Sequence, residues 1–361
     1  MMSFEAIAED KIANDKNGEK GKKDFANTVL GLPYRYKGDA PDWQRLMERR
    51  EDNLLRYRVP ARGLLLVASA DVQMRGVWYE VIAISPNRET WVVDRDYLEG
   101  DTSSPHNPVF ADLRARTLDK AFPDAFGRVR TIDALGIDSG YRAHVVYSWV
   151  RANQRLHPMT GRDMVLAIKG MDGWNPPPIG TPTPVDIDLD GKKIRQGCKL
   201  WPVGTWSLKA GFYSDLHKIG IRSGEQVDPD GYCHFGRWLD EAYFKQITSE
   251  HLTDIIVRKR VTGRRWEKTT DNHLLDCRIY NLALAEYLGL SSMTPEDWAE
   301  LARRRGLPDE LTALDLFAPR QRITSAPDVD AETEAGGPAV SPAPPPPQGN
   351  HYDRLAALND D

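Results

Sequence analysis

Three aspartates stand at positions where they could together bind divalent cations. Asp71 and Asp138 each end an apolar segment typical of a buried strand, and Asp276 lies near the start of a segment with a helical pattern. Hydrolysis of phosphodiesters by two metal ions needs several carboxylates around ions roughly 4 Å apart, and Mg²⁺ prefers such oxygen ligands. We therefore expect a metal site if these segments converge. The alternative for Asp71 is a strand-end acid that caps the following turn.

The elements that would position these aspartates follow from the apolar patterns. Runs of β-branched and aromatic residues predict strands, and apolar positions repeated at helical spacing predict helices. The predicted order is three strands, helix, strand, helix and strand, which is that of an α/β, ribonuclease H-like mixed sheet with flanking helices. In that fold the first and fourth strands lie side by side, so Asp71 and Asp138 would face each other, with Asp276 on the closing helix. The segments are 64–71, 77–84, 90–97, 107–121, 131–138, 141–156 and 164–169.

The composition excludes several classes of protein. The 361 residues carry a net charge of -5, which argues against nonspecific coating of nucleic acid but allows a local basic groove. Three scattered cysteines without a C-x-x-C pair are typical of a reducing cytoplasm. No apolar run approaches the roughly 18 residues of a membrane span. The charged N-terminus is not a secretory signal, and no phosphate-cradling loop motif occurs.

The segments outside this core differ in composition. Residues 170–207 are rich in Pro and Gly, and we expect an excursion from the core, with short strands, in which Trp174, Trp201 and Trp206 serve as packing residues. Residues 323–361 form a Pro-rich tail that cannot bury a core and should be disordered. The remaining patterns predict helices over residues 3–24, 42–57, 208–217, 240–252, 272–288 and 295–305, an edge strand over 231–235 and a hairpin over 255–268.

The predicted hairpin concentrates positive charge in an acidic chain. We expect it to turn at Thr262 and Gly263, and its basic side chains could contact a DNA backbone. The alternative is an ordinary solvated hairpin. The basic residues are Arg258, Lys259, Arg260, Arg264 and Arg265.

Other acidic and imidazole side chains have simpler interpretations. Asp94 and Asp96 end the third predicted strand, so we expect exposed turn acids, although Asp94 could lie near the site. Asp133 precedes the core of its strand and should be solvated. His234 and His251 are expected to be structural or surface residues, because no second His or Cys stands at zinc-ligand spacing.

Several short stretches, taken in order, resemble the large terminase subunit of lambda-like tailed phages, specifically its C-terminal nuclease half. The resemblance runs from about residue 3 to about residue 290, and it rests on the order and spacing of the stretches rather than on any one of them. The stretches are Phe25-Ala26-Asn27-Thr28-Val29-Leu30-Gly31, Ala70-Asp71-Val72-Gln73, Gly136-Ile137-Asp138-Ser139-Gly140, Trp201-Pro202-Val203-Gly204 with Lys209, Gly231-Tyr232-Cys233-His234-Phe235, Tyr243-Phe244-Lys245-Gln246 and Leu275-Asp276-Cys277-Arg278-Ile279-Tyr280.

The resemblance implies a nuclease that cuts concatemeric viral DNA during packaging with two Mg²⁺ or Mn²⁺ ions. Asp71, Asp138 and Asp276 would be the metal ligands, one ion activating the attacking water and the other stabilising the leaving oxygen. Lys209 would neutralise a phosphate, the alternative being a surface lysine. His273 stands where many relatives carry Glu. It would either shuttle a proton or hydrogen-bond Asp276, one turn away on the same helix face.

The resemblance also implies a division of the chain and a set of partners. Residues 1–58 would be a helical lead-in after an ATPase motor that this sequence lacks, residues 59–290 the nuclease, and residues 291–322 a helical extension. The expected partners are double-stranded DNA, the terminase small subunit and, through the tail, the portal protein, in the cytoplasm of a bacterial host and without a membrane. Two other functions stay open: a non-catalytic docking module, and a resolvase or recombinase on the same fold.

Overall fold

The computed structural model describes most of the chain between residues 41 and 307 and two short segments before it. All of these residues belong to the unit Met1–Arg322. The predicted tail, residues 308–322 of the predicted extension, and Trp174, Arg258 and Lys259 lie outside the described residues. The described ranges are 4–15, 25–29, 41–173, 175–189, 192–257 and 260–307.

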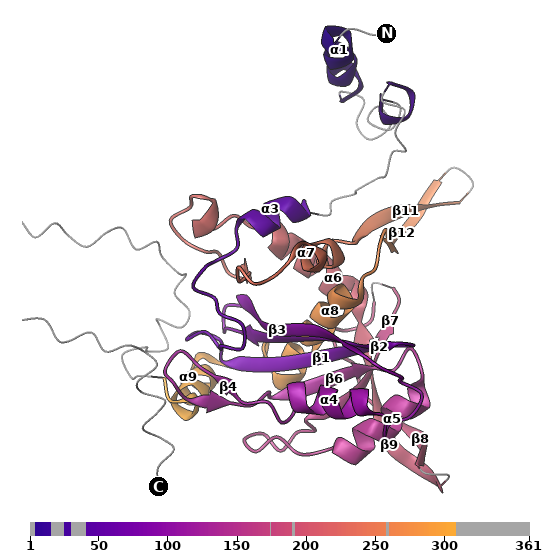
Figure 1. Ribbon diagram of the computed structural model, residues 1–361, viewed down its shortest axis with the longest axis vertical. Coiled ribbons are helices and arrows are strands. Elements are labelled where there is room, and N and C mark those ends of the chain that lie inside the picture. Colours follow the sequence, from indigo (N-terminus) through magenta and orange to yellow (C-terminus); the bar gives the residue numbers. More distant parts are fainter. Residues whose placement is uncertain are drawn as a thin grey trace, which may run out of the picture. The chain divides into compact units, whose positions relative to one another are not determined.

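Apolar runs form a central mixed sheet of eight strands in the order β10-β3-β2-β1-β6-β7-β9-β8. β1, β2 and β3 are an antiparallel meander, whereas β1, β6, β7 and β9 run parallel. The predicted adjacency of the first and fourth core strands is confirmed by the β1–β6 pair, and the α/β architecture is consistent with a ribonuclease H-like fold (Figure 1). The strands of this sheet are β1 (Leu65–Gln73), β2 (Gly76–Ile84), β3 (Thr90–Glu99), β6 (Ala134–Asp138), β7 (Val165–Met171), β8 (Thr183–Leu189), β9 (Lys192–Gly204) and β10 (Cys233–His234).

Helices pack on the sheet, and two hairpins lie outside it (Figure 1). Two short hairpins lie outside the main sheet: β4 (Phe122–Pro123) with β5 (Val129–Arg130), and β11 (Glu250–Val257) with β12 (Arg260–Lys268). None of the described helices is both long and apolar enough to cross a membrane. The helices are α1 (Phe4–Asp15), α3 (Trp43–Glu48), α4 (Pro108–Arg116), α5 (Ala143–Asn153), α6 (Thr205–His217), α7 (Glu241–Ile247), α8 (His273–Leu288) and α9 (Pro295–Arg305), with a π-helical turn η1 (Phe25–Val29) and a 3-10 turn η2 (Ile221–Ser223).

Alternation along β1 assigns its side chains to two different cores. Leu66 and Ala68 lie in the core that includes residues of α4 and α5. Leu65 and Val67 lie in the core that includes residues of α8 and α9. Because successive side chains point to opposite faces, the odd-numbered residues of β1, Asp71 among them, face α8. The same alternation places Asp138 of β6 on the α8 side, since Ala134 belongs to that core.

α8 is fixed on the sheet by a buried ionic network. Arg278 donates to Glu80 of β2 at 3.0 Å from Nε and 2.9 Å from Nη2, and Tyr243 of α7 donates to the same carboxylate at 2.8 Å. Glu80 and Arg278 have no exposed side-chain surface. Since a buried charge must be paired, this network sets the rotation of α8 about its axis and with it the direction of Asp276, two residues earlier.

The Pro- and Gly-rich segment 170–207 was predicted to leave the core, but much of it extends the sheet instead. β9 pairs in parallel with β7, and β8 pairs with β9 at the sheet edge. The predicted excursion is therefore not confirmed. β8 has the sequence TPVDIDL, in which apolar and acidic residues alternate as in a strand. The prediction instead relied on the Pro and Gly content of the whole segment.

Two predicted helices are shorter than expected. α3 ends at Glu48 because Arg49 and Arg50 turn their side chains to distant carbonyls, such as that of Lys218 at 2.8 Å, and Glu51 forms a bridge to Gly236. α7 ends at Ile247, after which Glu250 opens β11. By contrast, α9 begins with Thr294 as a full capping box, and α8 closely matches its predicted range.

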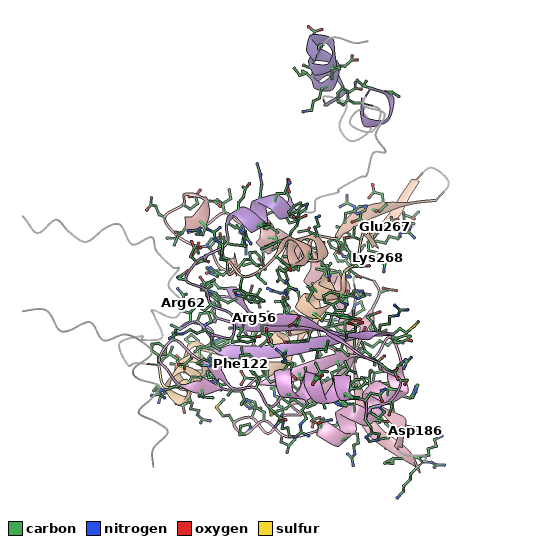
Figure 2. The ribbon with its side chains drawn as sticks, viewed as in Figure 1. Arg56, Arg62, Phe122, Asp186, Glu267 and Lys268 are labelled. Atoms are coloured by element: carbon green, nitrogen blue, oxygen red, sulfur yellow. The ribbon has the colours of Figure 1, made fainter. Side chains whose placement is uncertain are left out.

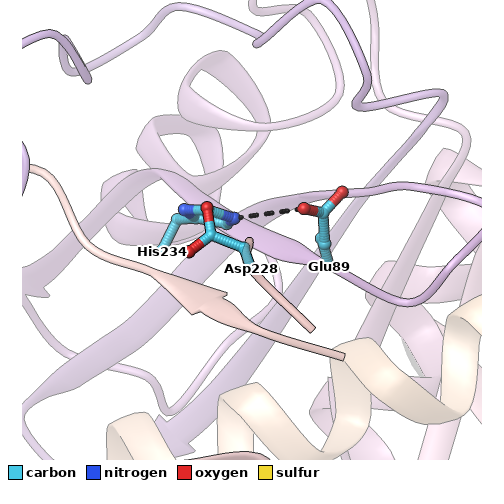
Figure 3. A group of neighbouring side chains, drawn as sticks. All are labelled: Glu89, Asp228 and His234. Atoms are coloured by element: carbon cyan, nitrogen blue, oxygen red, sulfur yellow. Dashed lines mark ion pairs between the residues drawn. The ribbon is translucent and has the colours of Figure 1, made fainter. Parts of the chain in front are cut away.

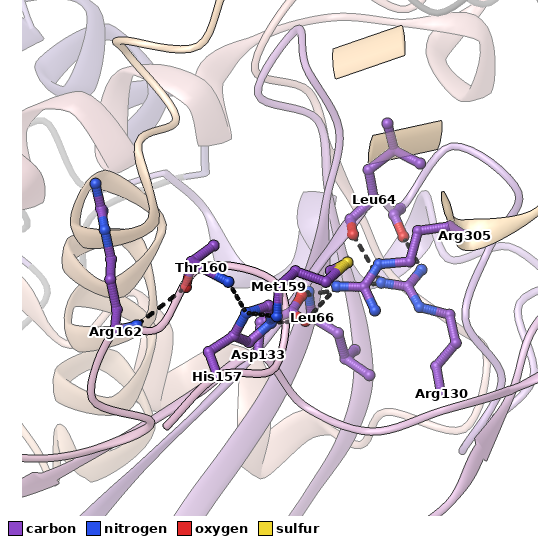
Figure 4. Close-up of polar contacts among 10 residues, drawn as sticks. Leu64, Leu66, Arg130, Asp133, His157, Met159, Thr160, Arg162 and Arg305 are labelled. Carbon is purple, nitrogen blue, oxygen red and sulfur yellow. Dashed lines mark hydrogen bonds and ion pairs between the residues drawn. The ribbon is translucent and has the colours of Figure 1, made fainter. Parts of the chain in front are cut away.

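Two acids that were expected to be solvated are buried. Asp94 accepts hydrogen bonds from Tyr79 Oη at 2.8 Å and from Arg56 Nε at 2.7 Å, and burial raises its pKa. Asp133 accepts from Leu66 N at 2.8 Å, lies 3.2 Å from His157 and pairs with Arg305 of α9 (Figure 4). Both predictions were wrong because the partners come from distant segments. Asp96 is partly exposed, as expected, and pairs with Arg56.

Candidate active site

Asp71 and Asp138 come together at one edge of the sheet. The parallel register pairs Ala70 with Ile137, so the next residue on each strand is one of these aspartates. Burial raises the pKa of Asp138 to about 6, and the negative charge of Asp71 contributes to this rise. Two carboxylates that oppose each other's ionisation must be close in a site of low polarity. Gly140 N donates to Asp138 at 3.0 Å and holds its orientation.

Asp276 joins this pair from the first turn of α8. Asn272 Nδ2 donates to it at 3.0 Å. Burial raises the pKa of Asp276 to about 7, against the positive charge of Lys209, and the carboxylates of Glu250, Asp71 and Asp138 raise it further. The structure therefore brings the three sequence-predicted aspartates into one electrostatic group.

His273 contacts a different aspartate from the one expected. Its Nδ1 lies 2.7 Å from Asp71 Oδ2, and its ring stacks on Trp78 with centroids 5.7 Å apart. Hydrogen bonding to Asp71 raises the pKa of His273. Gln73 donates to the other oxygen of Asp71 at 2.8 Å. The prediction of a hydrogen bond to Asp276 was wrong, because the first turn of α8 crosses over the end of β1.

Lys209 is buried rather than on the surface, and it has a partner that the sequence did not suggest. Its Nζ donates to both carboxylate oxygens of Glu250, at 2.7 and 2.9 Å, and lies 3.5 Å from Asp276 Oδ1. Glu250 also accepts from Asn272 at 2.8 Å, and its backbone N–H donates to Tyr213 Oη at 3.0 Å. Glu250 is thus a fourth acid of the site. It was missed because the segment was predicted to be helical to residue 252, whereas here it begins a strand.

The basic hairpin lies apart from these contacts as far as the structure describes it. The chain reverses between Val257 and Arg260, which pair with each other, so the predicted turn at Thr262 and Gly263 was wrong. Arg264 is exposed and pairs with Asp254 at 3.0 Å, and Arg265 is exposed and lies 3.8 Å from Glu267. Arg260 opens β12, and Arg258 and Lys259 lie outside the described residues.

The donor set at the sheet edge suits Mg²⁺ or Mn²⁺. Both ions favour carboxylate oxygens. The pKa values of Asp138 and Asp276 are raised mainly by burial and also by neighbouring carboxylates, whose negative charge a cation would offset. Among the described residues, the group with three ligand atoms within 4.8 Å of one another is a different one, Glu89, Asp228 and His234. Asp71, Asp138 and Asp276 do not meet this spacing for one ion, and two ions about 4 Å apart would spread their ligands more widely.

Comparison with known proteins gives the family. The model for the endonuclease domain of the terminase large subunit gpA matches residues 2–298. The chain is 28% identical to the terminase large subunit of Escherichia phage lambda over 276 residues, 74% of this chain and 39% of that protein. It is 26% identical to the terminase large subunit of Enterobacteria phage P21 over 277 residues, 73% of this chain and 38% of that protein.

The chain therefore spans about two fifths of the length of these curated relatives. No solved structure shows a significant match to it. The family match covers well over half of the sequence and includes every residue of the site described above. The chain belongs to the gpA family of terminase large subunits, as a member of its endonuclease domain.

Proposed function

We propose that this chain is a metal-dependent DNA endonuclease that cuts concatemeric viral DNA during genome packaging, by hydrolysis of the phosphodiester bond. The observation that carries the proposal is the convergence of Asp71, Asp138 and Asp276 from two neighbouring strand ends and the closing helix. Family membership supports the same reaction.

Asp71, Asp138 and Asp276 would hold two ions, Mg²⁺ or Mn²⁺. When bound, such ions lower the pKa of water and offset charge on the phosphate. The chain's own contribution is to arrange the carboxylates. Gln73 and His273 each take one oxygen of Asp71, and Asn272 and Lys209 orient Asp276.

Lys209 and His273 have further roles in this proposal. Lys209 keeps positive charge at the site and, shared between Glu250 and Asp276, is placed to offset the charge of an incoming phosphate. His273, whose pKa is raised by Asp71, can hold a proton at Nδ1 and release it to neighbouring water. Arg258, Lys259, Arg260, Arg264 and Arg265 would contact the DNA backbone along the hairpin.

The partners are also proposals. Double-stranded DNA is the substrate, and the terminase small subunit and the portal protein are the assembly partners, the portal through residues 323–361. The reaction would take place in the cytoplasm of the bacterial host. These assignments follow from the family, since its curated members are terminase large subunits.

A plasmid-cleavage assay with Mn²⁺ tests the proposal. The wild-type chain should nick or linearise the plasmid. Removing a residue that only hydrogen-bonds a metal ligand lowers activity by roughly 10- to 100-fold, and D71N, which removes a proposed ligand itself, should lower the cleavage rate by more than this. D186N is the matched control, because Asp186 is an exposed acid of β8 that pairs with Lys193 (Figure 2). Equal cleavage by D71N and wild type would show that the site is assigned wrongly. A chain that binds a portal ring and never cuts would favour the docking module, and selective cutting of branched DNA would favour a resolvase.

A further inference from the structure

A second cluster of possible metal ligands lies at the opposite end of β3 from the aspartates. His234 of β10 pairs with Trp91 near the start of β3, whereas Trp78, the partner of Asp71, pairs with Tyr97 near its end. Six residues of strand separate Trp91 from Tyr97, which is roughly 20 Å at about 3.3 Å per residue. The two clusters are therefore separate in space.

This cluster consists of Glu89, Asp228 and His234, each at most 1% exposed. One ligand atom from each lies within 4.8 Å of the others. In Figure 3 the ring of His234 and the carboxylate of Glu89 point toward each other, with Asp228 beside them. Zinc binds the ring nitrogen of His and the carboxylate oxygens of Asp and Glu, so all three side chains are possible zinc ligands.

Two polar atoms in this cluster lack the partner that burial demands. His234 Nε2 and Glu89 Oε1 have no hydrogen-bond partner among the described residues. They are 3.6 Å apart, which is too long for a hydrogen bond. Two ligands about 2.1 Å from a shared ion, at a tetrahedral angle, stand roughly 3.4 Å apart. The gap between these atoms thus fits an ion better than a direct contact.

The surroundings of His234 prepare its Nε2 for a metal. Its Nδ1 lies 2.6 Å from Glu51 Oε1, and its ring stacks on Trp91 with an interplanar angle of 4°. A metal-bound histidine commonly donates its other ring N–H to a carboxylate, which fixes the tautomer and turns the lone pair toward the ion. The remaining oxygen of Glu89 is held by Arg62 at 3.3 Å. His234 and Glu89 therefore each present one atom to the gap while other groups hold them, and Asp228 beside them accepts a hydrogen bond from Ile221 N at 2.8 Å.

We infer that Glu89, Asp228 and His234 bind one divalent transition-metal ion of the zinc type, separate from the nuclease site. The ion would join the turn before β3, the loop before β10 and β10 itself. Because the edge strand β10 pairs with β3 over only two residues, such an ion would fasten this edge to the sheet. Its role is structural, and the inference does not depend on the nuclease proposal.

The competing arrangement is metal-free, with a protonated His234 lying between Glu51 and Glu89. Burial alone would lower the pKa of His234, but the neighbouring carboxylates of Glu51 and Glu89 raise it above its ordinary value. Both arrangements use the same residues, so loss of stability on mutation alone would not separate them. The presence of a bound metal does separate them.

The test is zinc content, measured by elemental analysis of the full chain after zinc loading and dialysis. The D71N/D138N variant removes the other site, and it should retain about one equivalent of Zn²⁺. Adding H234Q should reduce this to none. A chelator should lower the Tm of D71N/D138N, and Zn²⁺ but not Mg²⁺ should restore it.

This second measurement, the change in Tm, needs no change at the proposed ligands, so it remains decisive if the H234Q chain fails to fold. A D71N/D138N chain without bound zinc and with a Tm indifferent to the chelator would overturn the inference and favour the protonated histidine.

Discussion

Two acidic groups at neighbouring turns of α8 are balanced in opposite ways: buried Glu80, which packs against the helix, and Asp276, which belongs to it. Glu80 receives Arg278, Tyr243 and Asn281, so its charge is fully engaged. Asp276 shares Lys209 with Glu250, and its burial together with the charges of Glu250, Asp71 and Asp138 raises its pKa to about 7. The difference shows how one helix serves two purposes. The turn with Arg278 fixes the helix on the sheet through its pairing with Glu80. The turn with Asp276 keeps negative charge available for a ligand.

The largest expected effect comes from breaking the satisfied network. R278M should lower the free energy of unfolding by about 3–5 kcal/mol, because it leaves Glu80 charged and buried without its partner. Denaturant unfolding measures this loss. R264M is the control, since that exposed pair with Asp254 should contribute less than about 1 kcal/mol.

The double variant E80Q/R278M sharpens this prediction. Removing the carboxylate charge as well should recover part of the lost stability, because the cost arises from the unpaired charge rather than from the lost contact alone. If R278M is no less stable than wild type, Glu80 and Arg278 do not anchor α8 in the way described.

Removing the charge of Asp276 should stabilise the folded chain, whereas R278M should destabilise it. An acid whose pKa is higher in the folded chain destabilises that chain as the pH rises from its unfolded pKa, about 4, to its folded pKa. For Asp276 the folded value is about 7. In metal-free buffer at pH 8, D276N should therefore be more stable than wild type by about 1–3 kcal/mol.

This gain should disappear near pH 4, where Asp276 is protonated in both folded and unfolded chains. D186N is the control, because a backbone hydrogen bond from Gln196 lowers the pKa of Asp186 and no gain at pH 8 is expected. A D276N chain less stable than wild type at pH 8 would mean that the ionised carboxylate of Asp276 does not destabilise the folded chain. The same variant should lose plasmid cleavage.

Glu250 tests whether the shared lysine matters for the reaction. E250Q weakens the hold on Lys209 and lets Lys209 pair more closely with Asp276, so cleavage should fall by roughly 10- to 100-fold. E267Q is the matched control on the same hairpin, because Glu267 is exposed (Figure 2). Unchanged cleavage by E250Q would restrict the site to the three aspartates, His273 and Lys209.

The smallest effect is expected at the exposed arginines of the hairpin. If Arg264 and Arg265 each contact a phosphate, then each replacement by alanine should reduce the slope of log K for DNA binding against log salt concentration by about 1. Filter binding at several salt concentrations measures this slope. K193A, which changes an exposed lysine of β9, is the control. Slopes equal to that of wild type would leave the hairpin as a solvated element.

The sequence predicted the core of the fold because its signals are local. The strand and helix segments are visible in the order of residues, and their order, which is that of a ribonuclease H-like fold, was enough to predict that β1 lies beside β6 and Asp71 beside Asp138. Burial and partner choice depend on segments far apart in the chain. For this reason the burial of Asp94, the partner of His273 and the place of Glu250 could not be predicted.

The cluster around His234 illustrates the same limit. Zinc-ligand spacing was sought between nearby His and Cys residues, whereas the atoms that meet here belong to Glu89, Asp228 and His234, with the turn before β3 contributing one of them. Only the parallel pairing of β10 with β3 brings these residues together.

The central claim is that Asp71, Asp138 and Asp276 hold the ions used for cleavage. A crystal of the chain soaked in Mn²⁺ and measured at the manganese absorption edge tests this most directly. The account predicts anomalous density between these three carboxylates, and its absence from a D71N/D138N crystal treated in the same way. A soaked wild-type crystal without density between the three aspartates, from a preparation that cleaves plasmid with Mn²⁺, would contradict it.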